Sequence, residues 1–240
     1  MSLLLSFIAA FLLGISKSGF KGLGIFVVVL LAINLEAKSS TGVLMPLLIL
    51  ADCFAIVYYR KDVNWKLLFQ ILPAMLFGVL FGVYVGEDIP KSDFKKIMSV
   101  IVFFSGFMML FFERMKKSYV PKGWWFATLM GLGAGFATMI GNLAGAFANL
   151  YFLALNIPKK KFIGTSAWLF FIVNLFKLPF HIFVWKTINI ESIIYSGRLA
   201  LFVIIGFYIG LRLIKYLSNE VFKKYVIIIT IIGAIVIYFK

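Results

Sequence analysis

The chain is poor in the residues on which most enzyme and metal sites depend. Its 240 residues include one cysteine, one histidine and nine acidic residues. A single Cys53 excludes a disulfide within the chain. The sequence also lacks a nucleophile elbow, a paired histidine–carboxylate motif and a P-loop ending in GKS or GKT. We therefore expect no enzyme, no metal site and no cofactor, although the chain could still be the membrane partner of a separate ATPase.

Apolar residues are abundant instead. They make up 63% of the chain, and the mean hydropathy is +1.05, whereas soluble domains contain about 45–50% apolar residues. Residues 1–13 lack a basic leading region and a small-residue cleavage site, so we read them as mature protein and not as a signal peptide. The composition predicts a multi-pass protein embedded in the lipid bilayer, and we expect this bilayer to be the cell (inner) membrane.

Positive charge is in excess, with 24 basic residues and a formal net charge of +15. The basic residues lie in short turns between apolar runs and do not form one continuous face. Cytoplasmic loops of membrane proteins carry such an excess. The charge therefore indicates orientation in the membrane, and we expect no nucleic-acid partner.

Two kinds of apolar segment alternate along the chain. Six runs are long enough to cross a bilayer, at about 20 residues each: 40–59, 66–86, 94–112, 162–185, 190–211 and 220–239. The segments 3–34 and 124–155 are longer, but glycine-rich stretches starting at Gly14 and Gly131 interrupt them. We expect arms of about 12–15 residues, or roughly 20 Å, which are too short for a hydrocarbon core of about 30 Å. Each broken segment is therefore predicted to form a re-entrant hairpin.

The basic residues support this topology. With two hairpins, fourteen basic residues fall on one side of the membrane and six on the other, whereas two full spans would divide them nine against eleven. The fold class is then all-α, a polytopic membrane protein of two inverted repeats, each a broken hairpin plus three transmembrane helices. The repeats cover residues 1–118 and 119–240 as one structural domain, and both termini face the outside. The strings Gly82–Gly86 and Gly206–Gly210 match each other, as expected of a duplication.

Ionisable residues inside apolar runs are expensive and mark functional sites by default. The candidates are Lys17, Lys21, Asp52, Lys177 and His181. Their sum is cationic, which suits an anion. Asp52 could take up a coupling proton, or it could form a static ion pair with Lys17 or Lys177. We consider Asp52, Lys21 and His181 for coupling or gating, although a lone histidine is more often a packing residue.

The tip of the first hairpin adds hydrogen-bond donors for an oxyanion. Its glycines, including Gly19 and Gly22, let backbone N–H groups turn inward, and Ser16 and Ser18 add hydroxyls beside Lys17. Alternatively, the glycines only permit close helix packing and the lysines extend to the membrane interface.

The second half offers neutral polar groups. Thr138, Gly141 and Asn142 lie in its hairpin tip, and Asn174 and Lys177 share one face of a later run. A constant offset places Asp52 opposite Asn174. The two halves are thus predicted to share one anion, with charge from the first half and polar donors from the second.

These motifs resemble the TauE/SafE sulfite exporter family, also called the toluene-sulfonate uptake permease family. GISKSGFKGLG, starting at Gly14, looks like the opening signature of the family, with Ser18 replacing one signature glycine. GLGAGFATMIGNLAG and FIGTSAWLFFIVNLFKLP look like its second block, with Ala146 where proline is common.

The resemblance covers essentially the whole chain and implies transport of small sulfur-containing anions. Our leading hypothesis is a secondary transporter that exports sulfite, sulfoacetate or an organosulfonate and binds it at the midplane between the repeats. A proton or another coupling ion and a homo-oligomer are compatible with this reading. An anion channel of the same fold and a non-transporting membrane partner are the alternatives.

Overall fold

The structure, a computed structural model, describes residues 3–35, 37–87, 89–90, 93, 96–97, 100–101, 103 and 123–238. Regular structure in these residues is helical throughout, which confirms the all-α class for them. The helices are α1 Leu3–Ser18, α2 Leu23–Asn34, α3 Ala37–Tyr58, α4 Trp65–Glu87, α6 Trp124–Gly141, α7 Ala144–Ala154, α8 Lys159–Pro179, its π-helical continuation η2 Phe180–Val184, α9 Ile190–Ile214 and α10 Asn219–Tyr238.

The predicted membrane runs agree with these helices to within a few residues. The runs 40–59, 66–86 and 190–211 match α3, α4 and α9, the run 162–185 matches α8 with η2, and the run 220–239 matches α10. The run 94–112 falls mostly outside the described residues. By length and composition, five described stretches could cross a membrane: Ser39–Tyr58, Trp65–Glu87, Trp124–Gly141, Lys159–Val184 and Ile190–Ile214.

Large apolar side chains cover the outside of these helices. On α4, Phe69, Phe77, Phe81 and Tyr84 follow helical spacing along one face and are 60, 67, 60 and 79% exposed. A soluble protein rarely exposes such a contiguous apolar face, whereas lipid tails would cover it. With the five apolar stretches, this face identifies a multi-pass membrane protein.

The first broken segment is interrupted at its expected position. Helix α1 continues past Gly14 to Ser18, and the chain then turns before α2 begins at Leu23. Within this turn, Gly19 and Gly22 have φ angles of 140° and 97°, which residues with a Cβ rarely adopt. The glycines at these two positions therefore create the break.

The second break also lies within its predicted glycine-rich stretch, at the tip that holds Gly141 and Asn142, but the helix before it is longer than expected. Gly131 is inside α6, and the helix ends only at Gly141, followed by Asn142 in the left-handed region with φ 57°. Helix α6 thus has 18 residues, or about 27 Å, so the expected arm of 12–15 residues was wrong for it. Gly131 does not break the helix because it serves packing: a Cβ there would lie 2.7 Å from the Ile71 carbonyl oxygen of α4.

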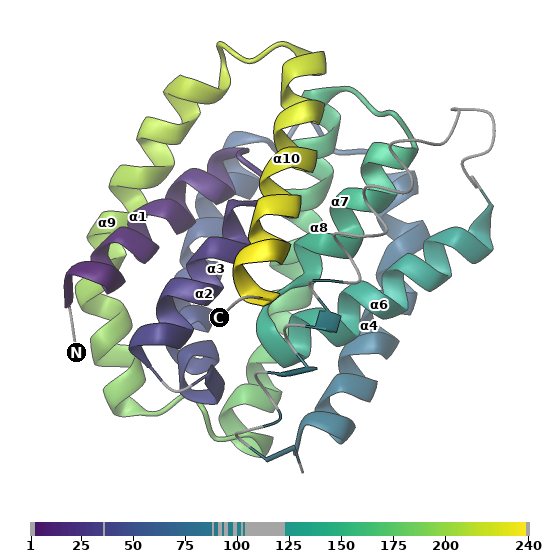
Figure 1. Cartoon of the computed structure of the whole chain (residues 1–240). Coiled ribbons are helices and arrows are strands. Elements are labelled where there is room, and N and C mark those ends of the chain that lie inside the picture. The colour runs from purple at the N-terminus through teal and green to yellow at the C-terminus, as the bar shows by residue number, and fades with distance from the viewer. Residues whose placement is uncertain are drawn as a thin grey trace.

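Each broken segment packs on a helix of the other half. Helix α1 runs beside α9, and α6 runs beside α4 (Figure 1). Added Cβ atoms at Gly206 and Gly78 would collide with the carbonyl oxygens of Phe11 and Leu132, respectively. In the same way, Gly210 faces Ser18 and Gly82 faces Met139. These contacts therefore pair Gly78 with Gly206 and Gly82 with Gly210. The sequence match instead pairs Gly82 with Gly206, so the two pairings differ by one helical turn.

Three loops meet at one end of the helices. Lys161 Nζ donates to the Val63 carbonyl at 3.3 Å, which joins the loop after α3 to the start of α8. Lys159 Nζ donates to the Ile214 carbonyl at 3.1 Å and also to the Leu217 carbonyl, after α9. At the opposite end of α4, Trp185 Nε1 donates to the Val83 carbonyl at 3.3 Å.

Candidate anion-binding site

A cavity lies between the two chain breaks. Its volume is about 70 Å³, counted as space open to the centres of water-sized spheres. One water needs about 10–15 Å³ by this measure, so the cavity can hold several waters or one small anion. Its polar lining side chains are Ser16, Lys17, Lys21, Thr138, Asn142, Asn149 and Asn174.

Two helices begin at this cavity. Gly22 and Gly24 at the start of α2 line it, and so do Leu143 and Gly145 at the start of α7. Neither helix start has a side-chain cap, and the helices are 12 and 11 residues long. The first N–H groups of a helix lack partners within it and carry a partial positive charge. In α2, the N–H groups of Leu23 and Ile25 already donate to the Phe20 and Gly22 carbonyls, so it is mainly the positive end of each helix dipole that faces the cavity.

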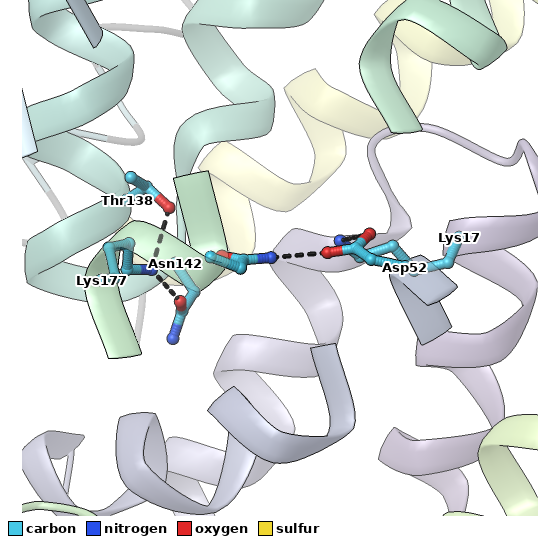
Figure 2. A network of polar contacts seen from close by, with 6 residues as sticks. Lys17, Asp52, Thr138, Asn142 and Lys177 are labelled. Carbon is cyan, nitrogen blue, oxygen red and sulfur yellow. Dashed lines mark hydrogen bonds and ion pairs between the residues drawn. The ribbon is translucent and has the colours of Figure 1, made fainter. Parts of the chain in front are cut away.

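On the α3 side of the cavity, Asp52 joins the two halves of the chain. Lys17 Nζ donates to Asp52 Oδ1 at 2.5 Å, and Asn174 Nδ2 donates to Asp52 Oδ2 at 2.7 Å (Figure 2). Asp52 is fully buried, on α3, while Asn174 comes from α8. Of the two lysines considered as partners of Asp52, the structure selects Lys17.

Lys21 follows Gly19 and precedes Gly22 in the first break. It is 4% exposed, and its Nζ lies 5.4 Å from the centre of the Phe170 ring, over which Lys17 Nζ also lies, at 5.3 Å. Within the described part of the chain, we find no hydrogen-bond acceptor for the Lys21 ammonium. A ring face offers only weak attraction to a cation compared with a carboxylate.

Lys177 holds the end of α6. It is fully buried and donates to Thr138 Oγ1 at 3.1 Å and to Asn142 Oδ1 at 2.6 Å (Figure 2). Both of its partners line the cavity, but Lys177 itself does not. The opposite end of the Asn142 amide, Nδ2, is buried without a partner among the described residues.

The buried charges do not balance. Among the described residues, the buried ionisable groups besides His181 are Lys17, Lys21 and Lys177 against Asp52. With His181 neutral, the formal excess is about two positive charges. Unpaired buried charge is costly, so an anion in the cavity would stabilise this arrangement.

The structure gathers most of the predicted site residues but not all of them. Those that line the cavity are Ser16, Lys17, Lys21, Gly22, Thr138, Asn142 and Asn174. Those that do not line it are Ser18, Gly19, Gly141, Asp52, Lys177 and His181. Asp52 and Lys177 lie directly behind lining residues, to which they are hydrogen-bonded.

Ser18 and His181 have partners away from the cavity. Ser18 Oγ donates to the Ile15 carbonyl at 2.8 Å and lies against Gly210, where a Cβ would collide with it. His181, on η2, is fully buried with its Nδ1 2.8 Å from Thr187 Oγ1, while its Nε2 has no partner among the described residues.

Two of the lining residues that sequence reasoning missed bring a buried amide and an aromatic ring to the cavity. Asn149 on α7 is 1% exposed, and its Oδ1 is unpartnered among the described residues. A polar residue within the apolar stretch of α7 was a usable signal. Phe170 carries no such signal, because one phenylalanine among 28 does not stand out.

The comparisons with known proteins agree with this architecture. Neither a curated protein nor a solved structure matches the chain. The family model described as sulfite exporter TauE/SafE matches residues 3–237, nearly the whole chain. With apolar spans outside, two broken segments inside and this full-length match, the chain belongs to the TauE/SafE sulfite exporter family.

Proposed function

We propose that this chain is a secondary transporter that exports a small sulfur oxyanion, bound in the cavity between the two breaks. One observation carries the proposal: two uncapped helix starts and a surplus of buried positive charge converge on a single cavity. Helix N-termini and ammonium groups together form an anion site. Membership of a sulfite exporter family supports sulfur oxyanions as the class.

The donors for the anion come from both halves. Ser16, Lys17 and Lys21 line the cavity from the first half, and Asn142 lines it from the second, with the positive ends of the α2 and α7 dipoles beside them. Such donors can replace the hydration shell of an oxyanion. With about 70 Å³, the cavity has room for an anion with the four heavy atoms of sulfite.

The packing supports two repeats, 1–118 and 119–240, related by a two-fold axis. Helix α1 packs on α9 while α6 packs on α4, so corresponding helices exchange partners, as they do across a two-fold axis. Asp52 and Asn174, which occupy corresponding positions, contact each other. Residues that contact their own counterparts lie next to such an axis. An axis in the membrane plane would make the repeats inverted and the two hairpins re-entrant from opposite faces.

The basic end of the molecule supports the predicted orientation. The loops near Val63, Lys159 and Leu217, which meet at one end, are rich in lysine and arginine. The positive-inside rule assigns this end to the cytoplasmic side of the cell membrane and both termini to the outside.

The engagement of Asp52 favours a structural role for this residue. Each of its carboxylate oxygens already accepts a hydrogen bond, one from Lys17 and one from Asn174. A static pair therefore explains Asp52 better than the uptake of a coupling proton.

Thermal unfolding of the detergent-purified protein tests the proposed site. A ligand that binds only the folded state raises its stability by mass action. We expect sulfite to raise the unfolding temperature more than chloride does at equal ionic strength, with sulfate, thiosulfate and sulfoacetate completing the panel. Equal responses to all of these anions would reject a sulfur-anion site.

A further inference from the structure

Lys177 is a buried cation that the anion cannot touch directly. It is fully buried, it does not line the cavity, and its acceptors are the hydroxyl of Thr138 and the amide oxygen of Asn142. Neither acceptor is charged. Charge compensation therefore does not explain why a lysine stands at this position.

The bond to Asn142 has a directional consequence. An amide has an accepting end and a donating end, and only the position of its partners distinguishes them. Lys177 has no acceptor capacity, so it binds only the oxygen end, at 2.6 Å. The donating end, Nδ2, must then point away from Lys177, and it has no partner in the described part of the chain.

The backbone leaves the amide little other choice. Asn142 ends α6 in the left-handed region with φ 57°, and its N–H bonds to the Thr138 carbonyl at 3.0 Å. The side chain starts from this fixed point, between Lys177 and the cavity that it lines. Figure 2 shows the amide oxygen turned toward Lys177 and the amide nitrogen turned away.

We infer that Lys177 is a positioning residue, which fixes Asn142 as a hydrogen-bond donor to the transported anion. It thereby selects against anions that would have to donate a hydrogen bond to Asn142. The inference rests on the proposed function. It assigns Asn142 Nδ2, and not Lys177 Nζ, to the anion.

Sulfate and hydrogen phosphate form a matched pair of probes. Both are tetrahedral dianions, but only hydrogen phosphate carries an O–H donor. Their affinities for the purified protein are measured by competition against radiolabelled sulfite. In Lys177→Met the amide can rotate and present its oxygen to the cavity, so sulfate loses a partner while hydrogen phosphate can gain one. We expect the ratio of sulfate affinity to phosphate affinity to fall about tenfold, the usual cost of an unsatisfied polar contact.

Two further variants separate orientation from charge and folding. Lys177→Arg keeps both the charge and the donor, so the wild-type ratio should return. Asn142→Asp keeps an acceptor for Lys177, and hence the local fold, but it replaces the donor by an oxygen. Its unfolding temperature without anion should stay within a few degrees of the wild-type value, while sulfite and sulfate binding should be lost.

The outcomes distinguish the inference from the proposed function. If Lys177→Met weakens both anions equally, or if Asn142→Asp binds sulfate as well as the wild-type protein does, Lys177 does not orient the amide and the inference is overturned. If the wild-type protein binds neither sulfite nor sulfate, the proposed function fails and takes the inference with it.

Discussion

Lys21 carries the least compensated charge among the described residues of the core. It is 4% exposed, and its ammonium lies over the Phe170 ring at 5.4 Å, whereas Lys17 is paired with Asp52. An ammonium in this position gains most from an anion in the cavity. Anion binding is therefore expected to depend on Lys21 more than on the other buried lysines.

Removing this ammonium should weaken anion binding specifically. A hydrogen bond to a charged group contributes about 1.5–3 kcal/mol, so Lys21→Ala should reduce sulfite affinity by roughly 10- to 100-fold. Lys224→Ala, which removes an exposed lysine of α10, is the matched control and should bind like the wild-type protein. Equal affinities of Lys21→Ala and Lys224→Ala for sulfite would remove Lys21 from the site.

Asp52 should matter for folding more than for anion binding. In Asp52→Asn, Lys17 loses its charged partner, and breaking a buried pair in this way costs about 3–5 kcal/mol. Because the variant has one negative charge fewer in its core, sulfite should raise its unfolding temperature by at least as much as it raises that of the wild-type protein. A variant of normal stability that no longer responds to sulfite would instead place Asp52 in the anion site.

The sequence predicted the residue types of the site better than their roles. Buried charge identified Lys17, Lys21, Asp52 and Lys177, because ionisable residues in apolar runs are conspicuous. It assigned Lys177 to the anion and Lys21 to coupling or gating, whereas Lys21 lines the cavity and Lys177 lies behind it, since that depends on which helix face points inward. The partner of Asp52 was limited to two lysines, and only the packing of α1 on α3 selected Lys17.

At the scale of elements, the two hairpins are held by close contact between glycines and backbone. Gly206 of α9 lies against the Phe11 carbonyl of α1, and Gly78 of α4 lies against the Leu132 carbonyl of α6. A methyl group at either position cannot fit without separating the helices.

Alanine substitution should test this close packing. Overpacking costs about 1–3 kcal/mol, so Gly206→Ala and Gly78→Ala should each lower the unfolding temperature. Gly197→Ala is the control on the same helix as Gly206, because a Cβ there meets nothing within 4 Å. There, alanine should be neutral or stabilise by up to about 1 kcal/mol through helix propensity. If all three variants behave alike, the close approach is not what holds the hairpins.

The elements were predictable where composition alone decides them. Helices α3, α4, α9 and α10 were predicted from the sequence because an apolar run of about 20 residues is the length that crosses a membrane. The break near Asn142 was predicted, but the 18-residue length of α6 before it was not, because a glycine-rich stretch can either end a helix or pack closely inside one. Gly131 does the second, and only its contact with Ile71 of α4 shows this.

At the scale of the whole molecule, the basic loops gather at one end, which we assign to the cytoplasm. Cysteine labelling in right-side-out membrane vesicles checks this on a Cys53→Ser background. An impermeant maleimide should label a cysteine in place of exposed Lys186 and leave one in place of exposed Ser218 unlabelled. The reverse pattern would reverse the orientation, and labelling of both positions would contradict the placement of Lys186 and Ser218 on opposite sides of the membrane.

Sulfite transport by this chain alone would establish that it is a transporter. Proteoliposomes that contain only the purified protein are loaded with radiolabelled sulfite, and release is followed into sulfite-free buffer and into buffer with a higher sulfite concentration than the lumen, with and without an imposed proton gradient. We predict saturable release that a gradient can drive against the sulfite concentration and that Lys21→Ala abolishes. Release no faster than from protein-free liposomes would contradict transport, and release that no gradient can drive uphill would identify a passive anion channel instead.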